Sequence, residues 1–361
     1  MSSESFFDKF YLLVIKNYRV YCAKKSSKHY FKLLKQHGIE RKKLSTDQKK
    51  QIDEVWGGLG KYDYNTHILD YSVTGEFNPE IMPEMLFRIK VELAMNNQSF
   101  KGAWADKSYF SFHFPKELFP KTIVSNAGGV FYDEDYNVLT KESAVKLIAE
   151  NSEFVVKPSL DSGVGKGIAR FENTENIEKI LNEYKKNFVV QEVFKQHQMI
   201  SEFNPSSVNV VRYISIFING KVVPIMAALR CGAAGSFNDN SITTDGLGMF
   251  VVGIDDKGVL KDRAYHSCGK QIERCPNGTE FAGKTIPGFE KMKDIIVDLH
   301  SKMAHFGFIS WDFVIDTEGN PKVMEYNIKG PGVLYYQYAN GPLLGDYTGE
   351  VIKWLKNEQE R

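Results

Sequence analysis

The chain has little cysteine, and this shortage restricts its class. Its 361 residues include only four cysteines. They are Cys22, Cys231, Cys268 and Cys275. Their spacing matches no zinc signature, and four cysteines in a chain of this length do not make a disulfide framework. We therefore expect free thiols and a reducing compartment.

Long apolar runs are also missing. The N-terminal segment is rich in apolar residues, but Asp8, Lys9, Lys16 and Arg19 interrupt it. No run reaches the roughly 18 consecutive apolar residues of a membrane-spanning helix. The segment also lacks the charged start, apolar middle and small-residue cleavage site of a signal peptide. We expect an amphipathic helix, no transmembrane segment and a cytoplasmic protein.

Neither sign of charge is in excess. The chain has 46 Lys and Arg against 45 Asp and Glu, for a net charge of +1. Such a balance gives no general attraction to nucleic acid, so no nucleic-acid partner is expected. The basic residues are nevertheless concentrated between Lys24 and Lys50. This stretch is either a solvated helical face, which is the commoner case, or a contact with an anionic partner or a membrane surface.

The residue pattern predicts an α+β protein with mostly antiparallel sheets. At 361 residues, two or three structural units are expected. No internal repeat or low-complexity linker divides them. The expected helices are residues 5–55, 83–95, 140–150, 173–184 and 289–305. The expected strands are 154–157 and 188–190, together with the hairpins 210–217/221–229 and 309–315/322–326.

A glycine-rich loop follows the strand at residues 154–157. This strand ends on Lys157, and the loop carries three glycines at alternate positions. The loop residues are Ser162, Gly163, Val164, Gly165, Lys166 and Gly167. Glycines let the backbone approach a ligand closely and direct its N–H groups at anionic oxygens. A lysine adds positive charge for phosphate. The pattern predicts a phosphate-binding loop, and a plain hairpin loop with glycines is the alternative.

Other phosphate-binding loops fit this segment less well. A P-loop requires Ser or Thr after its lysine, whereas Gly167 follows Lys166. A Rossmann fingerprint opens a helix directly after the strand, but residues 168–171 read as another strand. A protein kinase places its lysine after the glycine loop, and Lys157 precedes this one.

The second chemical signal is an acidic hairpin near the C-terminal end of the chain. If Glu318 and Gly319 form a two-residue turn, Asp312 lies directly opposite Glu325. Side chains two apart share a face, so Asn327 joins this pair. Opposed carboxylates repel each other, and a bound cation would relieve the repulsion. Two acids and an amide oxygen are hard ligands suited to Mg²⁺.

The opposite face of the hairpin is expected to pack into the core. Its apolar residues are Trp311, Phe313, Ile315 and Met324. A surface hairpin with scattered acids is the alternative. A single β-bulge would change which side chains share a face and would break the argument for a metal site.

With both signals in place, the chain resembles the ATP-grasp superfamily, and within it the sugar-transfer associated ATP-grasp family. The similarity runs through nearly the whole chain. The motifs are Asp106-Lys107, Lys157-Pro158 with the glycine loop, Gln191-Glu192-Val193-Phe194, the run from Asn204 to Arg212, Arg230, Trp311-Asp312, Glu325-Tyr326-Asn327 and Gln337. The resemblance implies an ATP-grasp fold, in which two α+β lobes with antiparallel sheets clamp ATP. Residues 1–105 would form a mainly helical region, 106–195 the N-lobe with the flap, and 196–361 the C-lobe with the metal hairpin.

The resemblance also implies roles for individual residues. Lys107 and Lys157 would contact the ATP phosphates, the flap 162–167 would close over them, and Gln191, Glu192, Val193 and Phe194 would form the adenine hinge. Asp312, Glu325 and Asn327 would hold Mg²⁺, with Mn²⁺ as a possible substitute. Asn209 and Arg212 would lie at the γ-phosphate, and Arg230 would bind a substrate carboxylate. Members often carry a ribose-binding acid shortly after the hinge, whereas the first acid here is Glu202.

The implied activity is that of an ADP-forming ligase. A carboxylate would be phosphorylated by ATP, and an amine would attack the acyl phosphate to form an amide. The family's association with sugar transfer suggests small-molecule substrates, with an amino acid or amino alcohol joined to a uronic acid in capsule or surface polysaccharide synthesis. The opposite polarity, a sugar or alcohol kinase, a peptide ligase acting on amino acids and a non-catalytic glycan-binding module stay open, as does a homodimer. The polar segment 232–248 is either an acceptor pocket or a surface loop.

Overall fold

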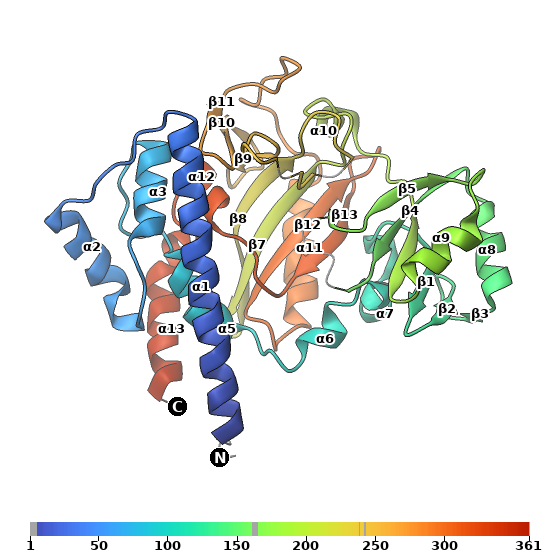
Figure 1. Ribbon diagram of the computed structural model, residues 1–361, viewed down its shortest axis with the longest axis horizontal. Helices are drawn as coiled ribbons and strands as arrows, with labels where there is room; N and C mark the ends of the chain where they lie inside the picture. Colours follow the sequence, from blue (N-terminus) through green and yellow to red (C-terminus); the bar gives the residue numbers. More distant parts are fainter. Residues whose placement is uncertain (1–5, 161–164, 238, 242, 361) are drawn as a thin grey trace.

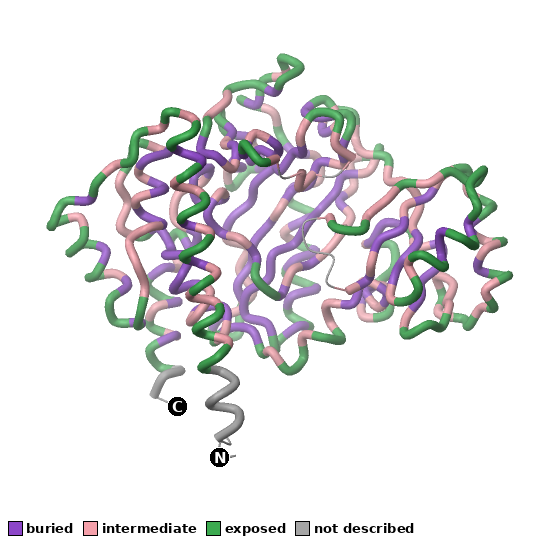
Figure 2. Tube along the Cα trace, in the orientation of Figure 1, coloured by how far each residue is buried: buried purple, intermediate pink, exposed green. Residues whose placement is uncertain are grey.

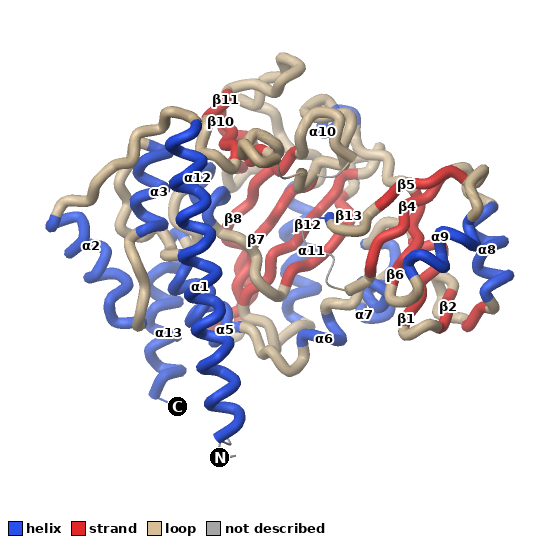
Figure 3. Tube along the Cα trace, in the orientation of Figure 1, coloured by secondary structure: helices blue, strands red, loops and turns tan. Residues whose placement is uncertain are grey.

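The computed structural model describes residues 6–160, 165–237, 239–241 and 243–360, with side chains described between residues 13 and 357. Two antiparallel sheets stand side by side, and a layer of helices covers the larger sheet (Figures 1 and 3). The expected α+β architecture with antiparallel sheets is confirmed.

The smaller lobe is a six-stranded sheet with the strand order β3-β2-β1-β6-β4-β5. Its strands are β1 (Thr122–Ala127), β2 (Val130–Tyr132), β3 (Val138–Leu139), β4 (Glu153–Pro158), β5 (Ala169–Glu172) and β6 (Phe188–Glu192). Helices α8 (Lys141–Ala149) and α9 (Ile177–Tyr184) pack on it around a separate apolar core. Thr140 caps α8, since its side chain accepts from the Ser143 N–H. Helix α9 begins four residues later than expected, because the Asn176 side chain caps it by accepting from the Lys179 N–H.

The larger lobe is a seven-stranded sheet with the order β11-β10-β9-β8-β7-β12-β13. Its strands are β7 (Val210–Ile218), β8 (Lys221–Cys231), β9 (Phe250–Ile254), β10 (Leu260–His266), β11 (Gln271–Ile272), β12 (Phe308–Ile315) and β13 (Pro321–Asn327). The β7–β8 turn holds Asn219 and Gly220 at φ of 50° and 76°, the backbone of a type I′ hairpin, so this hairpin is confirmed. Helix α11 (Phe289–Ser301) packs on one face of the sheet.

The N-terminal helices cover the other face of this sheet. They are α1 (Phe6–Gln36), α2 (Thr46–Trp56), η1 (Gly57–Leu59), α3 (Asn65–Thr74), α4 (Glu84–Leu86), the π-helical turn η2 (Phe87–Val91) and α5 (Glu92–Met95). The C-terminal helices α12 (Leu334–Asn340) and α13 (Thr348–Glu360) join them in one core with the sheet. Figure 2 shows this buried seam between the helices and the strands. The N-terminal region therefore shares its core with the larger lobe.

The segment 5–55 is helical as expected, but it divides into two helices. Helix α1 ends at Gln36, and Gly38 then adopts a left-handed φ of 70°, typical of a helix C-terminus. The chain re-enters a helix after Ser45, whose side chain accepts from the Gln48 N–H in a capping box. A glycine that ends one helix and a serine that starts the next therefore divide a segment whose composition alone favours a helix.

Asn96 fixes the helical region to the site strands. Its side chain is buried; it donates to the carbonyls of Phe308 at 2.7 Å and Ile328 at 2.9 Å and accepts from the Phe308 N–H at 2.9 Å.

The remaining helices are short and lie in connections. Four of them lead into the smaller lobe: α6 (Lys101–Trp104), η3 (Lys107–Tyr109), α7 (Phe110–His113) and η4 (Lys116–Leu118). Two others, α10 (Gln198–Ser201) and η6 (Gly345–Tyr347), lie in later connections. Across the described ranges, no helix combines the length and apolarity needed to cross a bilayer.

Candidate active site

The β12–β13 hairpin places its acids as expected, but by a different route. Asp312 pairs with Glu325, and Ser310 pairs with Asn327. The assumed two-residue turn is wrong, because the Asp316 N–H donates to the carbonyl of Asn320 at 3.0 Å and the loop is one residue longer. From Phe313, which pairs with Val323, the register is offset by one residue. A β-bulge at Met324 corrects that offset, so both carboxylates still share one face.

The bulge also moves Met324 to the other side of the hairpin. Met324 was expected in the core, but it faces the space between the lobes, where its sulfur lies 3.5 Å from Lys157 Nζ. Trp311 and Phe313 are buried as expected, and Val323 and Tyr326 complete their apolar layer. Met324 therefore adds an apolar surface to the candidate site.

A cavity of about 370 Å³ lies between the two lobes. It collects most of the residues singled out from the sequence. On its wall are Lys107, Lys157, Gly165, Gln191, Glu192, Val193, Phe194, Arg212, Arg230, Asp312, Glu325 and Asn327. A second cavity of about 570 Å³ shares Lys107, Lys157, Met324 and the four hinge residues, so the two adjoin. Two acids on the wall of this second cavity, Glu117 and Glu134, went unnoticed in the sequence.

Three residues of the glycine loop are described, and one of them reaches the cavity. Gly165 lines it together with Ile168, while Lys166 is exposed and Gly167 is not on the wall. Gly167 has a φ of 77°, and an added Cβ would lie 2.9 Å from the Pro158 ring, so the turn requires glycine. Ser162, Gly163 and Val164, predicted to contact ATP, lie outside the described residues.

Asn209 does not belong to this group of side chains. Its amide is buried and donates to the carbonyls of Ile200 at 2.7 Å and Asn204 at 3.1 Å. Its oxygen accepts from the Ser207 hydroxyl at 3.0 Å. Asn209 is not on the cavity wall. Its predicted place at the γ-phosphate is therefore corrected: it shapes the chain entering β7.

Two lysines and one acid meet where the lobes face each other. Lys107 Nζ lies 3.1 Å from Glu325 Oε1. The Lys157 side chain is buried, and burial followed by the like charge of Lys107 lowers its pKa to about 8. One carboxylate thus faces two cationic groups, and the surplus positive charge suits an anionic ligand.

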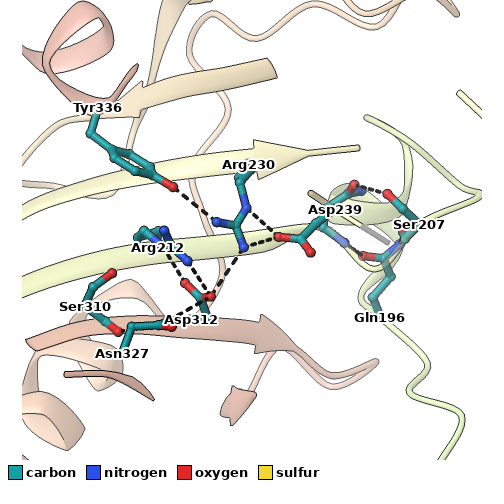
Figure 4. A network of polar contacts seen from close by, with 10 residues as sticks. Gln196, Ser207, Arg212, Arg230, Asp239, Ser310, Asp312, Asn327 and Tyr336 are labelled. Atoms are coloured by element: carbon teal, nitrogen blue, oxygen red, sulfur yellow. Dashed lines mark hydrogen bonds and ion pairs between the residues drawn. The ribbon is translucent and has the colours of Figure 1, made fainter. Parts of the chain in front are cut away.

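Arg212 and Arg230 meet on Asp312 (Figure 4). Arg212 donates from Nε and Nη2 to the two oxygens of Asp312, both at 2.7 Å. Arg230 Nη2 adds a contact at 3.3 Å. Burial alone would raise the pKa of Asp312, but these two guanidinium groups outweigh it and lower the pKa. Asp312 is therefore held ionised and in a fixed orientation.

Each nitrogen of the Arg230 side chain has a protein partner. Nε donates to Asp239 at 2.5 Å, Nη1 donates to the Tyr336 hydroxyl at 3.2 Å, and Nη2 pairs with both Asp239 and Asp312. A substrate carboxylate would therefore have to displace Asp239. Neither Asp239 nor Tyr336 was singled out from the sequence, although Asp239 belongs to the polar segment 232–248. Phe237, Asp239 and Asn240 of that segment line the cavity.

The family model described as "Sugar-transfer associated ATP-grasp" matches residues 95–352. The chain belongs to this family. The match covers the segment from the end of α5 into α13, which includes both sheets and every described residue of the cavity wall.

Solved structures resemble this ATP-grasp protein only distantly. A D-cycloserine synthetase, DcsG, is 14% identical over 69% of this chain and 71% of its own, with a TM-score of 0.38. The D-alanine–D-alanine ligase of Bacillus anthracis is 16% identical over 74% and 70%, with a TM-score of 0.38. The ATP-grasp ligase PsnB, complexed with a precursor variant, Mg and ADP, is 14% identical over 72% of this chain but 61% of its own, with a TM-score of 0.40. The chain thus spans less than two thirds of PsnB. No curated protein matches it.

The charge balance of this ATP-grasp site fits a divalent cation. Among the described residues, five cationic and four acidic side chains line the cavity, so they offset little of the charge of a triphosphate. Asp312 and Glu325 lie directly opposite each other, and Asn327 Nδ2 lies 3.4 Å from Asp312 Oδ2. These oxygen donors on one face suit Mg²⁺ completed by phosphate and water. The described residues hold no cluster of three or more His, Cys, Asp or Glu that would form a competing metal site.

Proposed function

We propose that this protein is an ATP-dependent carboxylate–amine ligase that forms an amide and releases ADP and phosphate. The observation that carries the proposal is the common cavity in which lysines of the smaller lobe face the acids and arginines of the larger one. Membership of the ATP-grasp family supports ATP as the co-substrate. The hinge strand β6 and Met324 would enclose the adenine, and Lys107 and Lys157 would hold the phosphates.

The chemistry proceeds in two steps. A carboxylate oxygen of the first substrate attacks the γ-phosphorus, and the bond to ADP breaks. Arg212, fixed by Asp312, stabilises the charge on the transferred phosphoryl group. The amine then attacks the acyl carbon, inorganic phosphate leaves, and the amine gives up a proton. Positioning and charge stabilisation carry both steps, so no serine or cysteine nucleophile is required.

Asp312, Glu325 and Asn327 would hold Mg²⁺. When bound, the ion neutralises phosphate charge and orients the γ-phosphate. The Arg212–Asp312 and Lys107–Glu325 pairs prepare the two carboxylates by fixing their orientation. Mn²⁺ has the same preference for oxygen ligands and would substitute.

We propose a uronic acid as the carboxylate substrate and an amino acid or amino alcohol as the amine, in capsule or surface polysaccharide synthesis. The family's association with sugar transfer supports a sugar substrate. A cluster of basic side chains beside the cavity, formed by Lys101, Lys329 and Arg19, supports a substrate that also carries phosphate. Lys329 lines the cavity beside Lys101; burial and then this like charge lower the pKa of Lys101 to about 8. Arg19 adjoins them, and the nearby acid Glu92 is already bonded to Arg19 at 3.0 Å and to the Gly330 N–H at 2.9 Å.

Replacing Lys101 with alanine is expected to raise KM for a nucleotide-linked uronic acid about tenfold, because one charge-assisted contact to phosphate is lost. The KM for ATP should not change. The matched control is the free uronic acid, for which wild type and Lys101→Ala should not differ. If both sugars lose affinity equally, Lys101 supports the fold and does not contact phosphate.

ADP release from Mg-ATP tests the function directly. The purified chain would be incubated with nucleotide-linked uronic acids crossed with amino acids and amino alcohols, and the products weighed by mass spectrometry. The proposal expects ADP only when both partners are present, with a product equal to their sum minus water. ADP with one partner and a stable product heavier by one phosphoryl group would show a kinase and overturn the ligase. Activity on amino acids without any sugar would show a peptide ligase.

A further inference from the structure

Helix α1 has a long outward stripe that the proposed reaction does not use. The residues at positions 14, 18, 21, 25, 28, 32 and 35 follow the alternating spacing of four and three that aligns side chains on one helical face. They are Val14, Tyr18, Tyr21, Lys25, Lys28, Lys32 and Lys35, and all are exposed. The first three are apolar or aromatic, and the other four are lysines. One face therefore changes along its length from apolar to cationic.

The apolar half of the stripe is exposed to an unusual degree. Val14 is 50% exposed, Tyr18 66% and Tyr21 60%, and their neighbour Leu13 is 56% exposed. The opposite side of the same helix is buried against the protein at Ala23, Ser27 and Leu34, so the helix is firmly seated. In Figure 1 the N-terminal half of α1 extends past the sheet, and Figure 2 shows exposed residues recurring along the helix. Contiguous exposed apolar side chains of this kind mark a contact surface.

The cationic half has no acid to balance it. From Lys9 to Ile39 the chain contains eight Lys and Arg residues and no Asp or Glu. Arg19 of this stretch is bonded to Glu92, whereas the four lysines of the stripe form no ion pair among the described residues. A chain whose net charge is +1 thus concentrates positive charge on one helix. Lysines near an anionic bilayer surface are attracted to it, while apolar and aromatic side chains insert between the headgroups. A bilayer surface satisfies both halves of the stripe at once.

We propose that the outward stripe of α1 docks this protein on an anionic lipid surface. The helix lies in the plane of the interface, with Val14, Tyr18 and Tyr21 inserted and the four lysines on the headgroups. A second copy of the chain fits less well, because self-pairing would bury lysines on a stripe that holds no acid. Nucleic acid would satisfy the lysines but leave the apolar half exposed.

Co-sedimentation of the full-length protein with lipid vesicles tests this surface. Vesicles of phosphatidylcholine mixed with phosphatidylglycerol should bind the protein, and vesicles of phosphatidylcholine alone should not. The quadruple variant Lys25→Gln, Lys28→Gln, Lys32→Gln, Lys35→Gln should bind at least about 100-fold more weakly. Tyr18→Ser with Tyr21→Ser should also weaken binding while keeping its dependence on anionic lipid.

A second quadruple variant provides the control. Changing Lys146, Lys179, Lys186 and Lys257 to glutamine alters the net charge equally on exposed sites away from α1. It should bind vesicles like the wild type, and all variants should keep the same ADP formation with soluble substrates. Equal losses in the two quadruple variants would mean general charge attraction and overturn the proposal. A concentration-dependent dimer broken by the tyrosine changes, without vesicle binding, would assign the stripe to a second copy instead.

Discussion

Replacing Glu325 with glutamine is expected to lower turnover by about 100- to 1,000-fold, in line with the loss of one preorganised group that stabilises transition-state charge. Glu325 lies opposite Asp312 and 3.1 Å from Lys107. Glutamine keeps the shape of the side chain but removes one of the two formal negative charges that would face the metal ion. The measurement is ADP formation against Mg²⁺ concentration, where the variant should need more Mg²⁺ and still turn over slowly.

The fold should survive this change. Glu325 is about one third exposed on its side chain, and its neighbours Val323 and Tyr326 hold the strand in the core. Glu318→Gln is the matched control, since this acid lies in the turn of the same hairpin, away from the cavity. It should leave turnover unchanged. Near-normal turnover in Glu325→Gln would remove Glu325 from the proposed metal site. A lower melting temperature in that variant would assign Glu325 a structural role.

The acid pair shows how far the sequence alone could go. Period-two alternation along β12 and β13 correctly placed Asp312, Glu325 and Asn327 on one face. The same reasoning misplaced Met324, because neither the longer turn nor the bulge leaves a signal in residue spacing. The longer turn and the bulge each shift the register by one residue, in opposite directions. The two shifts cancel at Asp312 and Glu325 but not at Met324, which lies between the turn and Glu325. Register near a turn depends on backbone hydrogen bonds, which the sequence pattern does not contain.

Contacts between side chains that lie far apart along the chain were also beyond prediction from the sequence. A sequence motif singled out Asn209 and Arg212 together, yet one faces backbone carbonyls and the other faces Asp312, one hundred residues away along the chain. Asp239 reaches Arg230 from the segment between β8 and β9, and Tyr336 reaches it from α12; no local periodicity predicts either contact. Strands, caps and glycine turns follow from local chemistry. The partners of a buried charge follow from how the lobes and loops pack.

Replacing Asp70 with asparagine is expected to stabilise the protein near neutral pH. Asp70 lies on α3, is only 4% exposed, and its Oδ1 has no hydrogen-bond partner among the described residues. Burial, with a smaller effect of Glu76, raises its pKa from 3.8 to about 8. The folded protein therefore takes up a proton that the unfolded chain has already released.

The sign of the pH dependence follows from this shift. Below about pH 4 the carboxyl is protonated in both states and carries no penalty. Between pH 4 and 8 only the folded state holds the proton, and the free energy of unfolding falls by about 1.4 kcal/mol per pH unit, or on the order of 4 kcal/mol by pH 7. An asparagine side chain does not titrate, so Asp70→Asn should match the wild type at about pH 4 and exceed it by roughly a few kcal/mol near pH 7 to 8.

Urea unfolding at pH 4, 6 and 8 measures this difference. Glu80→Gln is the control, because this exposed acid lies in the connection that follows α3 and should show no pH-dependent difference from the wild type. Turnover should be unaffected in both variants, since neither residue lines the cavity. A variant destabilised equally at all three pH values would mean that Asp70 is ionised and held by a partner. Stabilisation confined to high pH would instead identify a buried acid that is retained at a cost to the stability of the fold, on a helix that packs against α12.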